Sequence, residues 1–365
     1  MSGAHRVFAL SCHASYRCRH AGACCTAGWP IPVESDRLAR LRAAIAARAL
    51  QPPRAIDDAR LFEALPGAPT GTPAVLGVVD RACVFFDAER GRTCAVQRAL
   101  GHDALPLACR QFPRVVVRDP RGVSVTLSHY CPTAASLLSA PGPPSIVTDA
   151  AAFPPDAEYS GLDATTSLPP ALTPHVLMDW PSWWEIEHLA VDLIAVEAGS
   201  PERALARLGV LVEHARAWRP GGGAPLVTAV RTAGEHARAT TPVGWAPSGA
   251  WLAERCQIAL GAVPPELLSA APAVSPSGAS DISATVLTHF LSAHAFANWT
   301  AHLGRGLRSW QRSLEVAFAL VRSGRSVRDA DLILRHLADP HAFAAACSLA
   351  EDRILPSPWR TGVRV

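Results

Sequence analysis

Cysteine is the residue type in this chain whose number and spacing most directly indicate chemistry. A thiolate can bind a soft metal, carry an iron–sulfur cluster, form a disulfide or attack a substrate. Eight of the ten cysteines fall within the first 131 residues, which is too dense for packing alone and predicts a shared chemical role. The eight early cysteines are Cys12, Cys18, Cys24, Cys25, Cys83, Cys94, Cys109 and Cys131.

The compartment expected for the chain argues against disulfides. The apolar run near the N-terminus extends only from Val7 to Leu10, far short of the roughly 7–15 residues of a secretory signal. We therefore expect a cytoplasmic protein, in which clustered cysteines more often bind a metal or act in catalysis. A chain of 365 residues can also bury a sizeable core without cross-links.

The cysteine spacing indicates a metal or cluster site without naming the metal. Cys24 and Cys25 are adjacent, and a disulfide between neighbours strains the backbone. The zinc-finger and zinc-ribbon spacings are absent, as is the ferredoxin pattern C-x2-C-x2-C-x3-C. Cys256 and Cys347 stand alone in helical contexts, where we expect small core residues.

Composition excludes several other functions. The formal net charge of +3 is nearly balanced, so no nucleic-acid partner is evident, and no apolar stretch approaches the ~20 residues that span a membrane. The chain contains no lysine, which excludes a Walker-A phosphate loop and a lysine nucleophile. No glycine-rich loop follows a predicted strand, so a Rossmann nucleotide site is not visible.

Two predicted hairpins would position four of the cysteines. The β-prone runs 83–86 and 93–96 flank a turn that contains Gly91, which would bring Cys83 near Cys94. The alternating runs 115–117 and 123–127 flank the turn 119–122, which can return Cys109 and Cys131 to one end.

Helices are predicted on both sides of these hairpins. Leu38, Leu41 and Ile45 share one helical face, which predicts a helix over residues 36–49 with Ser35 as its N-cap. Pro132 suits a first helical position, which puts Cys131 at the cap of a short helix. After residue 180 the pattern is helical, with predicted helices at 183–198, 201–219, 249–260, 282–303, 307–322, 327–337 and from 340 into the 350s.

These elements predict a mainly α protein with a small cysteine-rich α+β part that carries β-hairpins. We expect a cysteine-cluster metal-binding domain over residues 1–140, a Pro-rich linker over 141–179 and a helical domain over 180–365.

Other polar residues near the cysteines have simpler interpretations. His13 and His20 could replace a cysteine ligand, although a solvated loop position is the expected one for both. His129 lies two residues from Cys131 and could hydrogen-bond a ligand sulfur. Arg110 and Arg114 follow Cys109 and could neutralise a cluster, or they could be ordinary surface arginines.

The combination of motifs resembles a known family. The matching pieces, in order, are Phe8 with Cys12, Cys24-Cys25 before Gly28-Trp29, Cys83-Val-Phe-Phe86, Cys94-Ala-Val-Gln97, Leu105-Pro-Leu-Ala-Cys109-Arg-Gln-Phe-Pro-Arg114 and Ser128-His-Tyr-Cys131-Pro-Thr. They are similar to the zinc- or iron-chelating cysteine-cluster family whose hallmark is CxxCxxCC, and most of all to its flagellin lysine-N-methylase branch. The first cysteines are spaced more widely here than in that hallmark, which puts Cys18 in most doubt as a ligand.

The resemblance implies a metal centre and a methyl transfer. It implies an iron–sulfur cluster of the [4Fe-4S] type, with zinc as the alternative, held by four of the eight early cysteines. It also implies transfer of a methyl group to lysine in a protein substrate such as flagellin, with S-adenosylmethionine as a candidate donor whose site the sequence does not reveal. The alternatives are a metal-binding or redox protein without methyltransferase activity and, more weakly, a thiol–disulfide enzyme.

Overall fold

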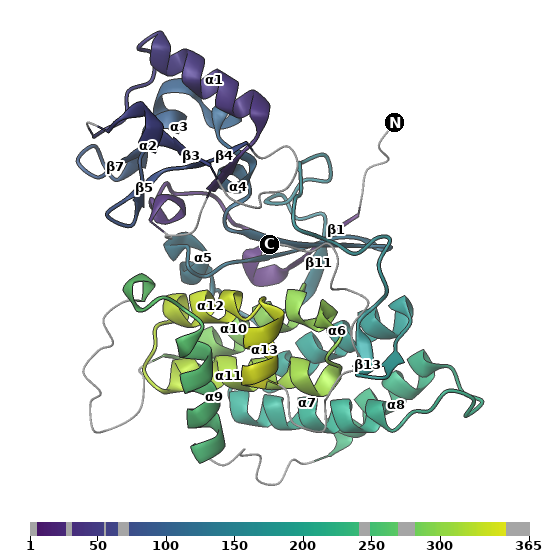
Figure 1. The fold of residues 1–365 in the computed structure, drawn as a ribbon. Coiled ribbons are helices and arrows are strands. Elements are labelled where there is room, and N and C mark those ends of the chain that lie inside the picture. The colour runs from purple at the N-terminus through teal and green to yellow at the C-terminus, as the bar shows by residue number, and fades with distance from the viewer. Residues whose placement is uncertain are drawn as a thin grey trace.

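The protein consists of helices and small sheets arranged in three parts. The computed structural model describes residues 6–26, 31–54, 56–64, 73–240, 249–268 and 282–347. A small N-terminal lobe, a central sheet and a larger group of helices follow one another from top to bottom in Figure 1. The fold is mainly α with a small α+β part, so the predicted fold class is confirmed.

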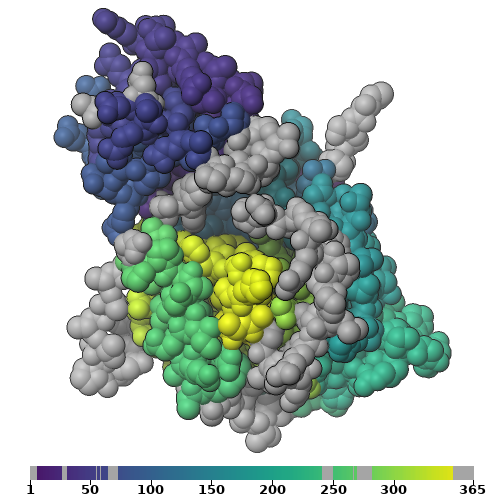
Figure 2. Space-filling model, viewed as in Figure 1, coloured from purple at the N-terminus to yellow at the C-terminus, as the bar shows by residue number. Residues whose placement is uncertain are grey.

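The N-terminal lobe, residues 31–111, forms the upper mass in the space-filling view (Figure 2). Its apolar core includes Val33, Leu41 and Phe85, which are fully buried. Its helices are α1 (Ser35–Ala46), α2 (Asp58–Leu61), α3 (Ala95–Leu100) and α4 (Leu107–Gln111). Its strands are β2 (Ile31–Val33), β3 (Phe62–Glu63), β4 (Ala74–Leu76), β5 (Val78–Val79), β6 (Ala82–Cys83), β7 (Phe86–Asp87) and β8 (Thr93–Cys94).

Two local predictions in this lobe need correction. Helix α1 begins at Ser35 itself, so Ser35 is not the N-cap; Glu34 is, and its side chain accepts a hydrogen bond from the Leu107 amide (3.0 Å). The hairpin around Gly91 is present but short, because β8 ends at Cys94 and Ala95 begins α3.

The central sheet joins strands from distant parts of the sequence. It contains β1 (Val7–Leu10), β9 (Arg114–Asp119), β10 (Gly122–Leu127), β11 (Ile146–Thr148) and β12 (Leu162–Asp163), in the order β11-β1-β10-β9-β12. β9 and β10 form the predicted antiparallel hairpin, whereas β1 runs parallel to β10 and pairs Phe8 with Ser124. Gly122 permits this pairing, because a Cβ there would lie 2.3 Å from the Arg6 carbonyl oxygen.

The helices of the third part pack against the central sheet, where Val191 and Ala293 join Leu10 and Val117 in one apolar cluster. They are α5 (Pro132–Leu137), α6 (Trp180–Val196), α7 (Pro201–Arg216), α8 (Leu226–Ala239), α9 (Gly249–Gly261), α10 (Ala284–Ala295), α11 (Leu307–Arg322), α12 (Val327–His336) and α13 (Pro340–Cys347), with the short strands β13 (Ala171–Thr173) and β14 (Val176–Leu177) beside them. Trp183 and Trp310 meet edge to face in the core, with ring centroids 6.0 Å apart. Cys256 and Cys347 are buried in the same core, as predicted.

One helical prediction is wrong, one helix was not predicted, and one prediction is covered only in part. The helix predicted over 282–303 ends at Ala295 because Ala297 has a positive φ of 52° and donates its amide to Glu187, and a 3-10 turn follows. Helix α8 was not predicted, although Leu226, Val230 and Ala233 supply a helical repeat on its buried face. The last helix is described only as far as Cys347, so its predicted extension into the 350s lies outside the described residues.

A buried ion pair ties the central sheet to the helices. Arg121 in the β9–β10 turn donates to Glu187 of α6, and the Glu187 side chain is 1% exposed. The other Glu187 oxygen accepts from the Ala297 amide (2.8 Å) just beyond α10. One carboxylate therefore joins the sheet, α6 and the end of α10. Among the helices in the described ranges, none has the length and apolar character needed to cross a membrane.

Replacing Glu187 by glutamine is expected to lower the free energy of unfolding by about 3 kcal/mol, because the buried Arg121 guanidinium loses its strongest partner. Urea denaturation checks this. The matched control is Glu185→Gln on the same helix, whose partner Arg231 is 62% exposed, and its effect should stay within about 1 kcal/mol. Equal effects of the two substitutions on the free energy of unfolding would contradict a stabilising role for the Arg121–Glu187 ion pair.

Candidate metal centre

Six of the eight early cysteines line one cavity. The cavity has a volume of about 310 Å³ and lies between the loop 16–25, strand β8, helix α4 and the start of α5. The cysteines that line it are Cys18, Cys24, Cys25, Cys94, Cys109 and Cys131. The predicted hairpin β9–β10 returns Cys109 and Cys131 to this site. The hairpin around Gly91 carries Cys94, but it pairs Cys94 with Phe86, whereas Cys83 pairs with Val78 in the β5–β6 hairpin and does not line the cavity.

A tight turn fixes the adjacent pair Cys24 and Cys25. The Cys25 amide donates to the Gly22 carbonyl (3.0 Å) in a 3-10 turn, and the two sulfurs lie 3.9 Å apart. Gly22 has a φ of 73°, and a Cβ there would lie 2.8 Å from both the Arg92 carbonyl oxygen and the Phe86 ring. Glycine therefore lets this loop approach the β7–β8 hairpin closely enough for Cys25 to reach Cys94.

Cys83 and Cys109 pack with the same group of thiols. Cys83 does not line the cavity and is buried in the apolar core of the N-terminal lobe, to which Cys25 belongs and against which the half-buried Cys94 and Cys109 pack. Cys109 lies on α4 and lines the cavity wall. Three cysteines of this lobe, together with Cys24 and Cys25 from the loop before it, therefore pack in or against one apolar core.

Two further cysteines, Cys131 and Cys18, line the cavity. Cys131 is the N-cap residue of α5, as predicted, and is buried, whereas Cys18 is exposed. Tyr16 lies beside them, and burial raises the pKa of its hydroxyl. Tyr16 and His102 both line the cavity and were not singled out from the sequence, although each lies between two of the early cysteines.

Cys12 lies outside the cavity. It packs with Leu10, Val117 and Phe296 in a separate apolar cluster, and burial raises the pKa of its thiol to about 12. The neighbouring His13 is fully buried, which corrects the expectation of a solvated loop position. His20 is exposed, as expected.

Arginine side chains give the cavity wall a positive character. Arg110 forms an ion pair with Glu158 (2.9 Å), and Arg114 donates to the Arg110 carbonyl (3.1 Å). Both side chains line the cavity, and the Nε atom of each is buried without a hydrogen-bond partner. These N–H groups can donate to an anionic sulfur or carboxylate in the cavity.

The five thiols at the core of the N-terminal lobe differ in acidity. A hydrogen bond from Cys25 lowers the pKa of Cys94 to about 7 and also lowers that of Cys24, whereas the pKa of the donor Cys25 is raised. Burial raises the pKa of Cys83 to about 12 and that of Cys109 well above its ordinary value. Cys24 and Cys94 are thus the thiols most ready to ionise, and a metal would have to displace protons from the others.

The donor set suits a soft metal. All ten cysteines are free thiols, so none of the eight early sulfurs is committed to a disulfide. Thiolate sulfur binds zinc and iron–sulfur clusters in preference to hard cations such as magnesium. The cavity offers more sulfurs than the four that one such centre requires, and buried arginine N–H groups that would offset its negative charge.

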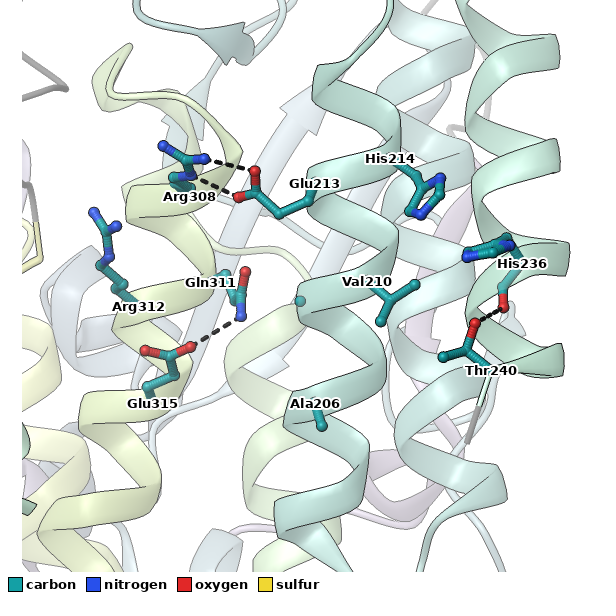
Figure 3. A pocket seen from close by; sticks show the side chains of 11 residues that line it. Ala206, Val210, Glu213, His214, His236, Thr240, Arg308, Gln311, Arg312 and Glu315 are labelled. Carbon is teal, nitrogen blue, oxygen red and sulfur yellow. Dashed lines mark hydrogen bonds and ion pairs between the residues drawn. The ribbon is translucent and has the colours of Figure 1, made fainter. Parts of the chain in front are cut away.

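A second hollow lies on the helices and has a different character (Figure 3). It has a volume of about 500 Å³ and lies between α7, α8 and α11, and it shares no residue with the cysteine cavity. In it Arg308 forms an ion pair with Glu213 (2.6 Å), and the Gln311 amide donates to the Glu315 carboxylate (2.9 Å). The hollow offers no cysteine, so the cysteine cavity is the candidate metal centre.

Comparisons of the chain with models of known families, with curated proteins and with solved structures give no match.

In the metal-free protein, Cys94 is expected to react with iodoacetamide with a pH midpoint of about 7, because its thiolate is already populated at neutral pH. Cys83 should stay unmodified at the same pH, since burial holds its thiol protonated. Peptide mass spectrometry over a pH series checks both rates. Modification of Cys83 as fast as that of Cys94 would contradict the assigned acidities.

Proposed function

We propose that the cysteine cavity binds an iron–sulfur cluster and that the protein methylates lysine side chains of a protein substrate such as flagellin. The observation that carries the metal centre is the convergence of six cysteines on one cavity of about 310 Å³. The methyl transfer rests on the sequence resemblance, which joins the same cysteines to the flagellin lysine-N-methylase branch.

The residues that would hold the cluster come from distant parts of the chain. Cys24, Cys25, Cys94 and Cys109 pack in or against the core of the N-terminal lobe, and Cys131 lines the same cavity at the start of α5. The cluster would supply a centre whose potential depends on the hydrogen bonds to its sulfurs. The buried Nε–H groups of Arg110 and Arg114 are the donors available for this purpose.

Metal analysis after anaerobic purification tests the centre. We expect about four irons and four sulfides per chain, as one [4Fe-4S] cluster requires. Cys109→Ala should lose most of this iron, whereas Cys256→Ala, which removes a buried core thiol elsewhere, should retain it. Stoichiometric zinc without sulfide would overturn the cluster assignment.

A methyl-transfer assay tests the activity separately. Iron-loaded protein, flagellin and labelled S-adenosylmethionine should give labelled methyl-lysine, detected after acid hydrolysis. The chain itself contains no lysine, so every labelled methyl-lysine must come from the substrate. Absence of label with a fully loaded protein would refute the methyltransferase and leave the metal centre standing.

A second candidate function is a zinc- or iron-binding or redox protein without methyltransferase activity. The distance of 3.9 Å between the Cys24 and Cys25 sulfurs favours it. A tetrahedral zinc ion with Zn–S bonds of about 2.3 Å holds its sulfurs about 3.8 Å apart, so this pair could share one ion. The metal analysis above separates the two candidates.

A further inference from the structure

A second group of metal-binding side chains lies outside the cysteine cavity. His129 follows strand β10, His294 belongs to α10 and Asp331 belongs to α12. One ligand atom from each lies within 4.8 Å of those of the other two, and in the described part of the chain no other group of histidine, cysteine or acidic side chains meets this criterion. His129 and Asp331 are fully buried, and His294 is 9% exposed.

The histidine nitrogens nearest the carboxylate lack hydrogen bonds. His129 Nδ1 lies 3.5 Å and His294 Nε2 lies 3.3 Å from the same Asp331 oxygen, Oδ1. Both nitrogens are buried, and neither has a partner with hydrogen-bond geometry. A buried polar atom without a hydrogen-bond partner lowers the stability of the fold, and here two such nitrogens lie beside the same carboxylate.

The distances from each histidine nitrogen to the carboxylate oxygen match the edges of a metal coordination shell. A tetrahedral ion with bonds of about 2.0–2.2 Å to nitrogen and oxygen holds its ligand atoms about 3.3–3.5 Å apart. The two measured distances, 3.3 and 3.5 Å, fall at these values. An ion placed among the three atoms would satisfy both nitrogens at once.

Neighbouring groups hold the three side chains in place. Ser128 Oγ donates to Asp331 Oδ2 (2.6 Å), which leaves Oδ1 to face the histidines. His13 Nε2 contacts His129 Nε2 at 3.2 Å, which directs the opposite nitrogen, Nδ1, toward the carboxylate. Such supporting hydrogen bonds are typical of metal-binding histidines and carboxylates.

The protonation states also suit metal binding. Burial lowers the pKa of His294 to about 4, so this imidazole is neutral near pH 7, which is the form that binds metals. Burial raises the pKa of Asp331, but Arg335 and the two histidines outweigh it and hold that pKa well below its usual range. The same Arg335 nitrogen donates to Oδ1 (3.3 Å) and to the Leu127 carbonyl oxygen (3.4 Å), and the Arg335 side chain is 25% exposed.

We propose that His129, His294 and Asp331 bind a divalent transition metal such as zinc, at a site separate from the cysteine centre. The ion would join the end of strand β10 to α10 and α12, three elements that are far apart in the sequence. Because the three side chains are enclosed in the core, the ion would brace the junction between the central sheet and the helices.

Metal content of matched variants tests this proposal. After loading with Zn²⁺ and dialysis, His294→Gln should hold one equivalent less zinc than the wild-type protein, because an amide is a poor zinc ligand. The control His302→Gln changes a histidine that packs between Trp180 and Trp183 and should retain the wild-type content. Equal zinc in the wild type and His294→Gln would overturn the site.

Cobalt spectroscopy of the unmodified protein gives a test that does not depend on a variant folding. Cobalt bound by cysteine gives strong near-ultraviolet charge-transfer bands, whereas cobalt bound by nitrogen and oxygen gives only weak visible bands. We expect the unmodified protein to bind one equivalent of cobalt of the second kind. If every equivalent of bound cobalt brings sulfur bands, the site is refuted. A nitrogen- and oxygen-bound equivalent in a wild-type protein that holds no iron and sulfide after anaerobic purification would refute only the proposed function.

Discussion

The antiparallel pairing of β9 with β10 is the constraint on which the other elements depend. Six residue pairs, from Gly122 with Asp119 to Leu127 with Arg114, hold the hairpin together. Its outer edges receive β1 and β12, and its turn supplies the arginine that α6 binds through Glu187. Cys109 precedes the first strand of the hairpin and Cys131 follows the second, so the pairing of the two strands brings both cysteines to the cavity.

Much of this local structure can be predicted from the sequence. The alternation of valines around the turn 119–122 predicts the hairpin, and Pro132 places Cys131 at the cap of α5. Helix α11 begins and ends at the predicted residues, Leu307 and Arg322, because a single apolar face and the flanking glycines define it. These features depend on residues close together in the chain, so the pattern and the turn chemistry suffice.

The remaining features depend on contacts that no local pattern encodes. Helix α10 ends early because the Ala297 amide donates its hydrogen bond to the Glu187 carboxylate of α6. His13 looks like a loop residue until its partner His129 is known, and Asp331 looks like a surface residue of an amphipathic helix. For the cysteines, the sequence predicts the convergence of most members but not the separation of Cys12, whose burial follows from helices that are added much later.

The parallel pairing of β1 with β10 sets an order of events during synthesis. Phe8 leaves the ribosome long before Ser124, so the first strand has no partner until the hairpin has emerged. The thiols from Cys12 to Cys25 follow that strand and stay accessible to oxidants and to competing metals throughout this interval. Under the proposed function, a centre that uses Cys131 together with Cys24 and Cys25 would assemble only after translation has passed Cys131, so these early thiols would have to stay reduced until then.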